Sequence, residues 1–196
     1  MHFSIQQIYK IMNEVGRRNF LPSELKYLAD IEEALPIGHD QTISQPYIVA
    51  FMTAALSPDK DDKVLEIGTG SGFQAAVLAK LAHKIYTVEI IKTLADEARE
   101  RLFQLGYENV FVQHGDGYWG WNEQAPYDCI IVTACAETVP QTLIDQLKLG
   151  GRMIIPVGPV HGAQSLVLIQ KDEAGVISSK NVLAVRFVPF TRNIRL

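Results

Sequence analysis

The fold is decided by the stretch Lys63-Val-Leu-Glu-Ile-Gly-Thr-Gly-Ser-Gly72. Its first half is apolar and β-branched, which is typical of a short strand buried on both faces of a parallel sheet. The three glycines then end the strand in a tight turn, because glycine adopts positive φ and places no Cβ between the backbone and a ligand. Residues 73–82 follow with a small apolar face at helical spacing. This order of strand, turn and helix predicts the opening of a nucleotide-binding α/β unit, whose helix N-terminus favours an anionic group.

The spacing of the glycines favours one kind of cofactor. A dinucleotide fingerprint starting at the first glycine needs glycine at position 73, where phenylalanine stands. One starting at the second glycine needs position 75, where the looser form of the motif accepts the alanine present. An acid, Glu66, precedes the first glycine, and this pattern resembles motif I of class I S-adenosylmethionine-dependent methyltransferases. A second apolar run, 85–88, ends in Glu89, at about the separation expected of a ribose-binding carboxylate.

Length and composition limit the class of protein. The 196 residues correspond to one domain, or to one domain with a small N-terminal cap. A hydrophobic content of 47% with 20% charged residues is usual for a globular protein. The net charge of −4 argues against a general nucleic-acid binder, and no apolar run reaches membrane-spanning length. The N-terminus lacks a secretory apolar segment. We therefore expect a cytoplasmic protein in which Cys129 and Cys135 are buried, reduced thiols.

Other patterns predict the remaining elements. Apolar residues at helical spacing predict a helix over residues 3–15, and Ser23 opens a second helix that runs to about Ala34. Residues 34–46 are polar and rich in turn formers, so we expect a loop. Further helices are expected at 47–56, at 92–105 with a stop at Gly106, and at 140–147; further strands are expected at 110–113, 127–134, 153–157, 165–171 and 182–188. The predicted fold is a doubly wound α/β sandwich with a seven-stranded, mostly parallel sheet and a short N-terminal helical cap. The last two strands are expected to be antiparallel.

Four segments carry a closer resemblance. Residues 34–38 read Ala-Leu-Pro-Ile-Gly, 41–46 read Gln-Thr-Ile-Ser-Gln-Pro, 156–158 read Pro-Val-Gly and 185–190 read Val-Arg-Phe-Val-Pro-Phe. Together they resemble the protein-L-isoaspartate O-methyltransferase family over roughly residues 34–191. The resemblance implies methyl transfer from S-adenosylmethionine to the free carboxylate of L-isoaspartyl residues in damaged proteins. The ester then promotes succinimide formation and repair. It also implies a methyltransferase domain over residues 35–196 behind a cap of residues 1–34, and we expect a monomer.

The resemblance also implies the site. In this family the serine of Thr-Ile-Ser lies at the active site, so Ser44 and Thr42 would orient the substrate carboxylate. Ser71 would lie near the methionyl end of the cofactor, Glu89 would hold the ribose, and Asp116 with Gly117 would bind the adenine. The cofactor-binding residues implied are Gln41, Thr42, Ile43, Ser44, Val49, Glu66, Gly68, Gly70, Ser71, Gly72, Glu89, Asp116, Gly117 and Thr191. From the residues alone, Ser44 could equally be the N-cap of the helix that follows, with Pro46 in its first turn.

The chemistry explains why no catalytic base stands out. A carboxylate is already ionised at neutral pH, and a sulfonium is activated by its own charge. Placement of the two groups and exclusion of water remain for the protein to supply. No zinc-binding, Walker A or nucleophile-elbow motif occurs, so no metal site is expected.

Two alternatives remain open at this stage. The first is a methyltransferase of the same fold that acts on a different carboxylate, and the second is a non-catalytic S-adenosylmethionine-binding protein. The presence of both Thr42 and Ser44 argues against the second. Two departures from the family pattern, residues 16–18 (Gly-Arg-Arg for a common Val-Pro-Arg) and Asp40 for a usual glycine, bear on peptide specificity more than on cofactor binding.

Overall fold

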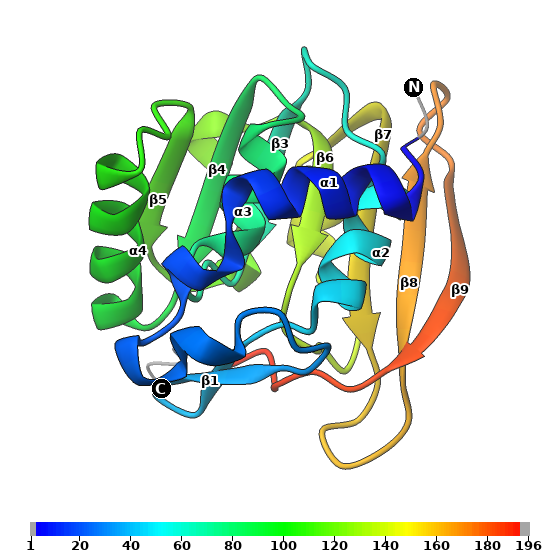
Figure 1. Ribbon diagram of the computed structural model, residues 1–196. Helices are drawn as coiled ribbons and strands as arrows, with labels where there is room; N and C mark the ends of the chain where they lie inside the picture. The colour runs from blue at the N-terminus through cyan, green and yellow to red at the C-terminus, as the bar shows by residue number, and fades with distance from the viewer. Residues whose placement is uncertain (1–2, 193–196) are drawn as a thin grey trace.

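The computed structural model describes residues 3–192, and the outer ends of the predicted cap and domain, 1–2 and 193–196, lie outside this range. The described residues form a seven-stranded sheet in the order β5-β4-β3-β6-β7-β8-β9 (Figure 1). Its strands are β3 (Lys63–Ile67), β4 (Lys84–Glu89), β5 (Val110–His114), β6 (Tyr127–Val132), β7 (Leu147–Val157), β8 (Gln164–Lys171) and β9 (Ile177–Val185). The first five run parallel, and β8 pairs antiparallel with both of its neighbours. The predicted fold, including the antiparallel closing pair, is confirmed.

Successive side chains of the strands point to opposite faces of the sheet, which produces two hydrophobic clusters. Val64 and Ile131 lie in the first cluster, together with α1 (Ile5–Val15), α2 (Pro46–Leu56) and α3 (Phe73–Ala79). In Figure 1, α1 crosses the front of the sheet, and it contacts both α2 and α3. Leu65 and Ile130 lie in the second cluster with α5 (Gln141–Asp145), while α4 (Lys92–Gln104) contributes Leu102 to the first. Both faces of the sheet are therefore covered, as parallel strands require.

The N-terminal segment begins as predicted and then departs from the prediction. Helix α1 starts with a capping box between Ser4 and Gln7 and ends at Gly16, which has φ +74°. The predicted second helix is wrong, because the chain forms two 3₁₀ helices, η1 (Arg17–Phe20) and η2 (Ser23–Leu28), and then bends. The carbonyls of residues 29, 31 and 33 accept hydrogen bonds from the Arg17 side chain, so they are not available to a continuing helix.

The predicted loop at 34–46 is also wrong, because it contains a hairpin of β1 (Leu35–Gly38) and β2 (Gln41–Ile43). The two turn residues, His39 and Asp40, have φ values of +52° and +57°. A two-residue turn with positive φ at both positions matches the twist of paired strands, and aspartate tolerates this conformation better than most residues. The tip is attached to the start of α4 by a 2.9 Å hydrogen bond between His39 Nε2 and Thr93 Oγ1.

Element boundaries differ from the prediction at several places. Helix α3 stops at Ala79, three residues early, and α5 covers only Gln141–Asp145. Strand β7 begins six residues early at Leu147, and β9 lies at Ile177–Val185 instead of 182–188. The early start of β9 follows from the turn before it, in which Asp172 Oδ1 accepts hydrogen bonds from the N–H groups of Ala174 and Val176. Gly106 has φ +78°, which confirms the stop after α4, and both cysteines are free and buried.

A search of residues 3–192 finds no helix with the length and apolar character needed to cross a bilayer.

The burial of α1 gives a test of whether the N-terminal segment shares the main core. Ile8 is fully buried. We expect Ile8→Ala to lower the free energy of unfolding by about 2–5 kcal/mol, because truncation leaves a cavity in a packed core. Urea denaturation followed by circular dichroism measures the change, with the exposed Gln6→Ala as control, expected within about 0.5 kcal/mol of the unmodified protein. A separate early transition for α1, or no change in midpoint, would contradict a shared core.

Candidate active site

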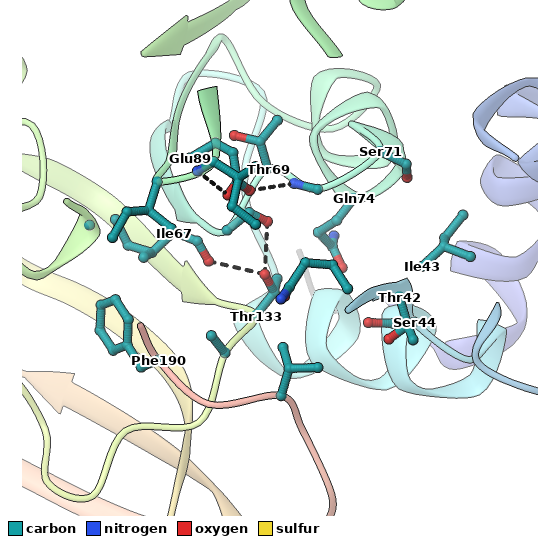
Figure 2. Close-up of a pocket in the computed structure, with 18 of the residues that line it drawn as sticks. Thr42, Ile43, Ser44, Ile67, Thr69, Ser71, Gln74, Glu89, Thr133 and Phe190 are labelled. Atoms are coloured by element: carbon teal, nitrogen blue, oxygen red, sulfur yellow. Dashed lines mark hydrogen bonds between the residues drawn. The ribbon is translucent and has the colours of Figure 1, made fainter. Parts of the chain in front are cut away.

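The carboxyl ends of the parallel strands meet at a cavity that opens to solvent. In an open α/β sheet this edge is where ligands bind. The glycine turn after β3 forms one wall, and Glu89, Gly117 and Thr133 come from the ends of β4, β5 and β6. Residues 41–44, at the end of the hairpin, form another wall. Figure 2 shows Thr42 and Ser44 across the pocket from Ile67 and Phe190.

Most of the predicted site residues come together here. The cavity lining includes Gln41, Thr42, Ile43, Ser44, Val49, Gly68, Gly70, Ser71, Glu89, Gly117 and Thr191. Three predicted residues, Glu66, Gly72 and Asp116, do not belong to this lining. Gly72 lies at the N-cap of α3, one residue beyond the lining residue Ser71.

The glycine turn approaches a neighbouring strand too closely for a side chain. Gly68 has φ +94°, and a Cβ built on it would overlap with the Thr133 hydroxyl. The Thr133 Oγ1 lies 3.0 Å from the carbonyl oxygen of Ile67 and 2.8 Å from that of Gly68, which share its single proton. At the other end of the turn, Arg101 Nη1 donates to the carbonyl of Ser71 at 2.8 Å. The turn is therefore held at both ends by side chains from other elements.

The Glu89 carboxylate joins the end of β4 to the glycine turn. One oxygen accepts from the N–H of Gly70 at 2.9 Å, and the other accepts from the N–H of Ile91 at 3.0 Å. Each carboxylate oxygen can accept more than one hydrogen bond, so both oxygens keep capacity for hydroxyl groups in the cavity. This arrangement suits a ligand with neighbouring hydroxyls.

The structure does not bring Glu66 into the cavity. Its side chain is fully buried and accepts a 2.6 Å hydrogen bond from the Thr87 hydroxyl. The hydroxyls of Thr87 and Thr69 are 2.7 Å apart; since the single proton of Thr87 goes to Glu66, Thr69 donates to Thr87. Thr69 lines the cavity, so Glu66 reaches it only through two threonines. The pKa of Glu66 is raised to about 8, mainly by burial, with the hydrogen bond from Thr87 lowering it and the charge of the nearby Glu89 raising it.

Asp116 makes contacts within its own loop and with the C-terminal segment. Its Oδ1 accepts from the N–H of Tyr118 at 3.0 Å, and its Oδ2 accepts from Arg192 Nε at 3.1 Å. The Arg192 guanidinium also stacks on the Tyr118 ring, 3.5 Å from its centroid. The adjacent Gly117 lines the cavity with no room for a side chain, because a Cβ there would overlap with Ile67. Recognition of an adenine by Asp116 stays a prediction.

Ser44 is not the helix N-cap. The cap position of α2 is Gln45, which makes no side-chain capping bond, and Pro46 is the first helical residue. Among residues 3–192 the Ser44 hydroxyl has no hydrogen-bond partner, so it is available to a ligand. The sequence-based alternative that Ser44 caps the helix is therefore wrong.

Sequence reasoning missed several lining residues. Thr133 directly follows β6, and Gln74 lies in the first turn of α3, where its amide donates to Thr53 Oγ1 at 2.9 Å. The position of Thr133 at a strand's carboxyl end could have identified it. Gln74 and Phe190 carried no such signal, because they enter the cavity through tertiary packing. In residues 3–192 no group of three or more His, Cys, Asp or Glu side chains could hold a metal ion.

Comparison with known proteins gives the family. The model described as "Protein-L-isoaspartate(D-aspartate) O-methyltransferase (PCMT)" matches residues 2–195. The chain belongs to the protein-L-isoaspartate O-methyltransferase family. It is 52% identical to Protein-L-isoaspartate O-methyltransferase 2 of Polaromonas sp. over 186 residues, which are 95% of this chain and 88% of that protein. It is 55% identical to the Protein-L-isoaspartate O-methyltransferase of Alteromonas mediterranea, over 94% of this chain and 87% of the relative.

Solved structures of this family have the same fold. A protein-L-isoaspartate O-methyltransferase structure matches with a TM-score of 0.79 and 30% identity, over 95% of this chain and 65% of that longer chain. A Plasmodium falciparum chain named for the same activity, in complex with S-adenosyl-L-homocysteine, matches with a TM-score of 0.79 and 26% identity. That match covers 95% of this chain and 90% of the other.

The buried position of Glu66 predicts an unusual dependence of stability on pH. Because its pKa in the folded state lies above the ordinary 4.5, the folded protein binds more protons than the unfolded chain between about pH 5 and pH 8. Stability from Glu66 is complete at the acid end of this window and falls as the pH rises. Relative to Glu66→Gln, we expect the unmodified protein to lose up to about 1.4 kcal/mol of unfolding free energy per pH unit. Urea midpoints of both proteins at pH 5, 6, 7 and 8 measure this, and a difference that stays constant over the range would refute it.

Proposed function

We propose that this chain transfers the methyl group of S-adenosylmethionine to the free carboxylate of L-isoaspartyl residues in proteins and peptides. Family membership supports the activity. The observation that carries the assignment of the site is that Thr42, Ser44, Thr133 and Val188 line both the cavity and an open groove beside it. Three hydroxyl side chains therefore lie at the junction between a space for the methyl donor and a space for a peptide. The Thr133 hydroxyl is bonded to the glycine turn, which leaves those of Thr42 and Ser44 for a substrate.

The residues of the cavity fit the cofactor. The Glu89 carboxylate suits the two ribose hydroxyls, and apolar side chains such as Ile67, Val88 and Phe190 suit a flat adenine ring. The glycine turn lets the backbone approach the methionyl end. When bound, S-adenosylmethionine supplies a methyl group made electrophilic by the positive sulfur.

The protein's own contribution to the reaction is orientation of the carboxylate. The substrate carboxylate is ionised at neutral pH, so no base has to remove a proton. The hydroxyls of Ser44 and Thr42 donate hydrogen bonds that point the carboxylate toward the cavity. Neutral donors hold it without the stronger charge withdrawal of an arginine, and so preserve its nucleophilicity. Arg186, exposed at the groove, adds positive charge that attracts an anionic peptide.

The wider cellular setting follows from sequence properties. We propose a monomeric, cytoplasmic protein that does not act on nucleic acid, on the strength of its net charge of −4 and its two free cysteines. Residues 1–34 would serve as a cap on the methyltransferase domain of residues 35–196.

A pair of peptides tests the activity. Methyl transfer from radiolabelled S-adenosylmethionine is measured on an isoaspartyl peptide and on the same peptide with ordinary aspartate. We expect methylation of the isoaspartyl form alone. Equal labelling of both peptides would favour a less selective carboxyl methyltransferase, and labelling of neither, with intact cofactor binding, would favour a binding protein.

The role of Ser44 predicts a loss of turnover without a loss of stability. We expect Ser44→Ala and Ser44→Gly to lower the methylation rate about tenfold to a hundredfold, the effect of one neutral donor in the transition state. The melting temperature should change little, because the hydroxyl has no partner among residues 3–192. Ser178→Ala, at an exposed position on β9, is the matched control. Turnover near that of the unmodified protein in Ser44→Gly would remove Ser44 from the catalytic site.

Binding of the ribose by Glu89 can be distinguished from its hydrogen bond to Gly70 in the glycine turn. Glu89→Ala should weaken binding of S-adenosylhomocysteine about tenfold to a hundredfold, because hydrogen bonds to a charged group are lost. Calorimetric titration is repeated with an analogue that lacks one ribose hydroxyl. If Glu89 binds the ribose, the variant loses less affinity for the deoxy analogue than for the parent compound. Equal losses for both would mean that Glu89 acts only by holding Gly70.

A further inference from the structure

Arg17 is a buried charged residue that the reaction described above does not use. It is 6% exposed and follows Gly16 at the end of α1. Its guanidinium donates four hydrogen bonds, all to backbone carbonyls: Ala29 at 3.0 Å, Ile31 at 3.3 Å, Glu33 at 2.7 Å and Ser44 at 3.1 Å. Its Nε has no partner among the described residues, so the two outer nitrogens make all of these contacts.

The two terminal guanidinium nitrogens of Arg17 bond to different parts of the chain. Nη1 donates to Ala29 and Ile31, which fixes the bent segment after η2. Nη2 donates to both Glu33 and Ser44, and so joins that segment to the residue that presents the candidate catalytic hydroxyl. Ala34, the neighbour of Glu33, and Ser44 both line the open groove. A single nitrogen atom therefore sets the separation of two parts of the groove wall.

The Glu32 side chain also connects residues 29–33 to the chain that follows Ser44. Glu32 Oε2 accepts a 3.1 Å hydrogen bond from the N–H of Tyr47 in the first turn of α2, and Glu32 Oε1 accepts from the Tyr9 hydroxyl at 2.7 Å. The charges of Glu32 and of Asp30 also favour the charged form of Arg17, against the burial that lowers its pKa. Residues 30–33 and Arg17 thus form one polar network around the start of α2.

We propose that Arg17 is a positioning residue for the substrate side of the active site. By holding the carbonyl of Ser44 against residues 29–33, it fixes where the Ser44 hydroxyl stands at the junction of groove and cavity. This inference rests on the proposed role of Ser44. Arginine is needed because its planar fork of donors serves four carbonyls at once, whereas the single nitrogen of lysine serves fewer.

Steady-state kinetics distinguish positioning from general support of the fold. Arg17→Met keeps the aliphatic stem, and Arg17→Lys keeps the charge. We expect both variants to lower kcat/KM for an isoaspartyl peptide at least tenfold, with lysine the milder change. The Kd for S-adenosylhomocysteine should stay within about twofold, because of the residues that bond to Arg17 only Ser44 lines the cofactor cavity. Lys10→Met, at an exposed position on α1, is expected to behave like the unmodified protein.

A destabilised control separates lost stability from lost position. Val15→Ala removes buried volume from the same segment but leaves in place the hydrogen bond from Arg17 to the Ser44 carbonyl. All proteins are assayed well below their melting temperatures. If Val15→Ala loses as much kcat/KM as Arg17→Met, or if cofactor affinity falls in parallel with kcat/KM, Arg17 supports the fold alone and the proposal is overturned.

Hydrogen exchange supplies a readout that needs no substrate. Within residues 44–48, the backbone amides other than Pro46, which has no N–H, should exchange faster in Arg17→Met and Arg17→Lys than in Val15→Ala. Amides of α4 should stay equally protected. Unchanged exchange at 44–48 would overturn the inference whatever the activity. Failure of the unmodified protein to methylate the isoaspartyl peptide would instead count against the proposed function.

Discussion

The close approach of Gly68 to Thr133 is the constraint on which the site depends. The backbone after β3 comes within hydrogen-bond distance of a side chain from the end of β6, and a Cβ would not fit between them. Because Gly68 is fixed there, the chain turns toward the cavity before α3 begins. The N–H of Gly70 in this turn donates a hydrogen bond to the Glu89 carboxylate. The position of the cofactor cavity therefore follows from the pairing of two central strands.

Arginine side chains hold irregular backbone both at this site and toward the opposite edge of the sheet. Arg17 donates hydrogen bonds to carbonyls in the segment before β1 and to that of Ser44. Arg101 donates to the carbonyl of Ser71. Arg152 donates to the carbonyls of Leu56 and Ser57 at the end of α2. Buried carbonyls that lack partners in a helix or sheet have to be satisfied in another way. A planar cation with several donors can satisfy several of them at once. Order in these segments thus comes from long-range side-chain contacts.

Elements that depend on local sequence pattern could be predicted, whereas segments ordered by long-range side-chain contacts could not. Apolar runs and glycine turns predicted the sheet and its parallel core, since these depend on local pattern and on the meeting of strand ends. Most of the residues that line the cavity were expected from the family resemblance. The helix expected from Ser23 to Ala34 does not form, because the side chain of Arg17, several residues earlier, donates hydrogen bonds to carbonyls of this segment. The hairpin was missed because neither central residue of its turn, His39 or Asp40, is glycine. Glu66 was expected at the cofactor from its motif alone, whereas the structure buries it outside the cavity lining, connected to the lining residue Thr69 through Thr87.

The edge strand β9 affects how this protein meets other chains. A strand at the edge of a sheet presents unpaired backbone groups, on which an extended segment of another protein can add and start aggregation. On this edge Ser178, Ser179, Lys180 and Asn181 are consecutive, exposed and polar. Polar and charged side chains discourage such pairing. A protein that acts on damaged chains encounters partly unfolded segments. The polar edge disfavours pairing of such segments with β9, and so favours their contact with the groove.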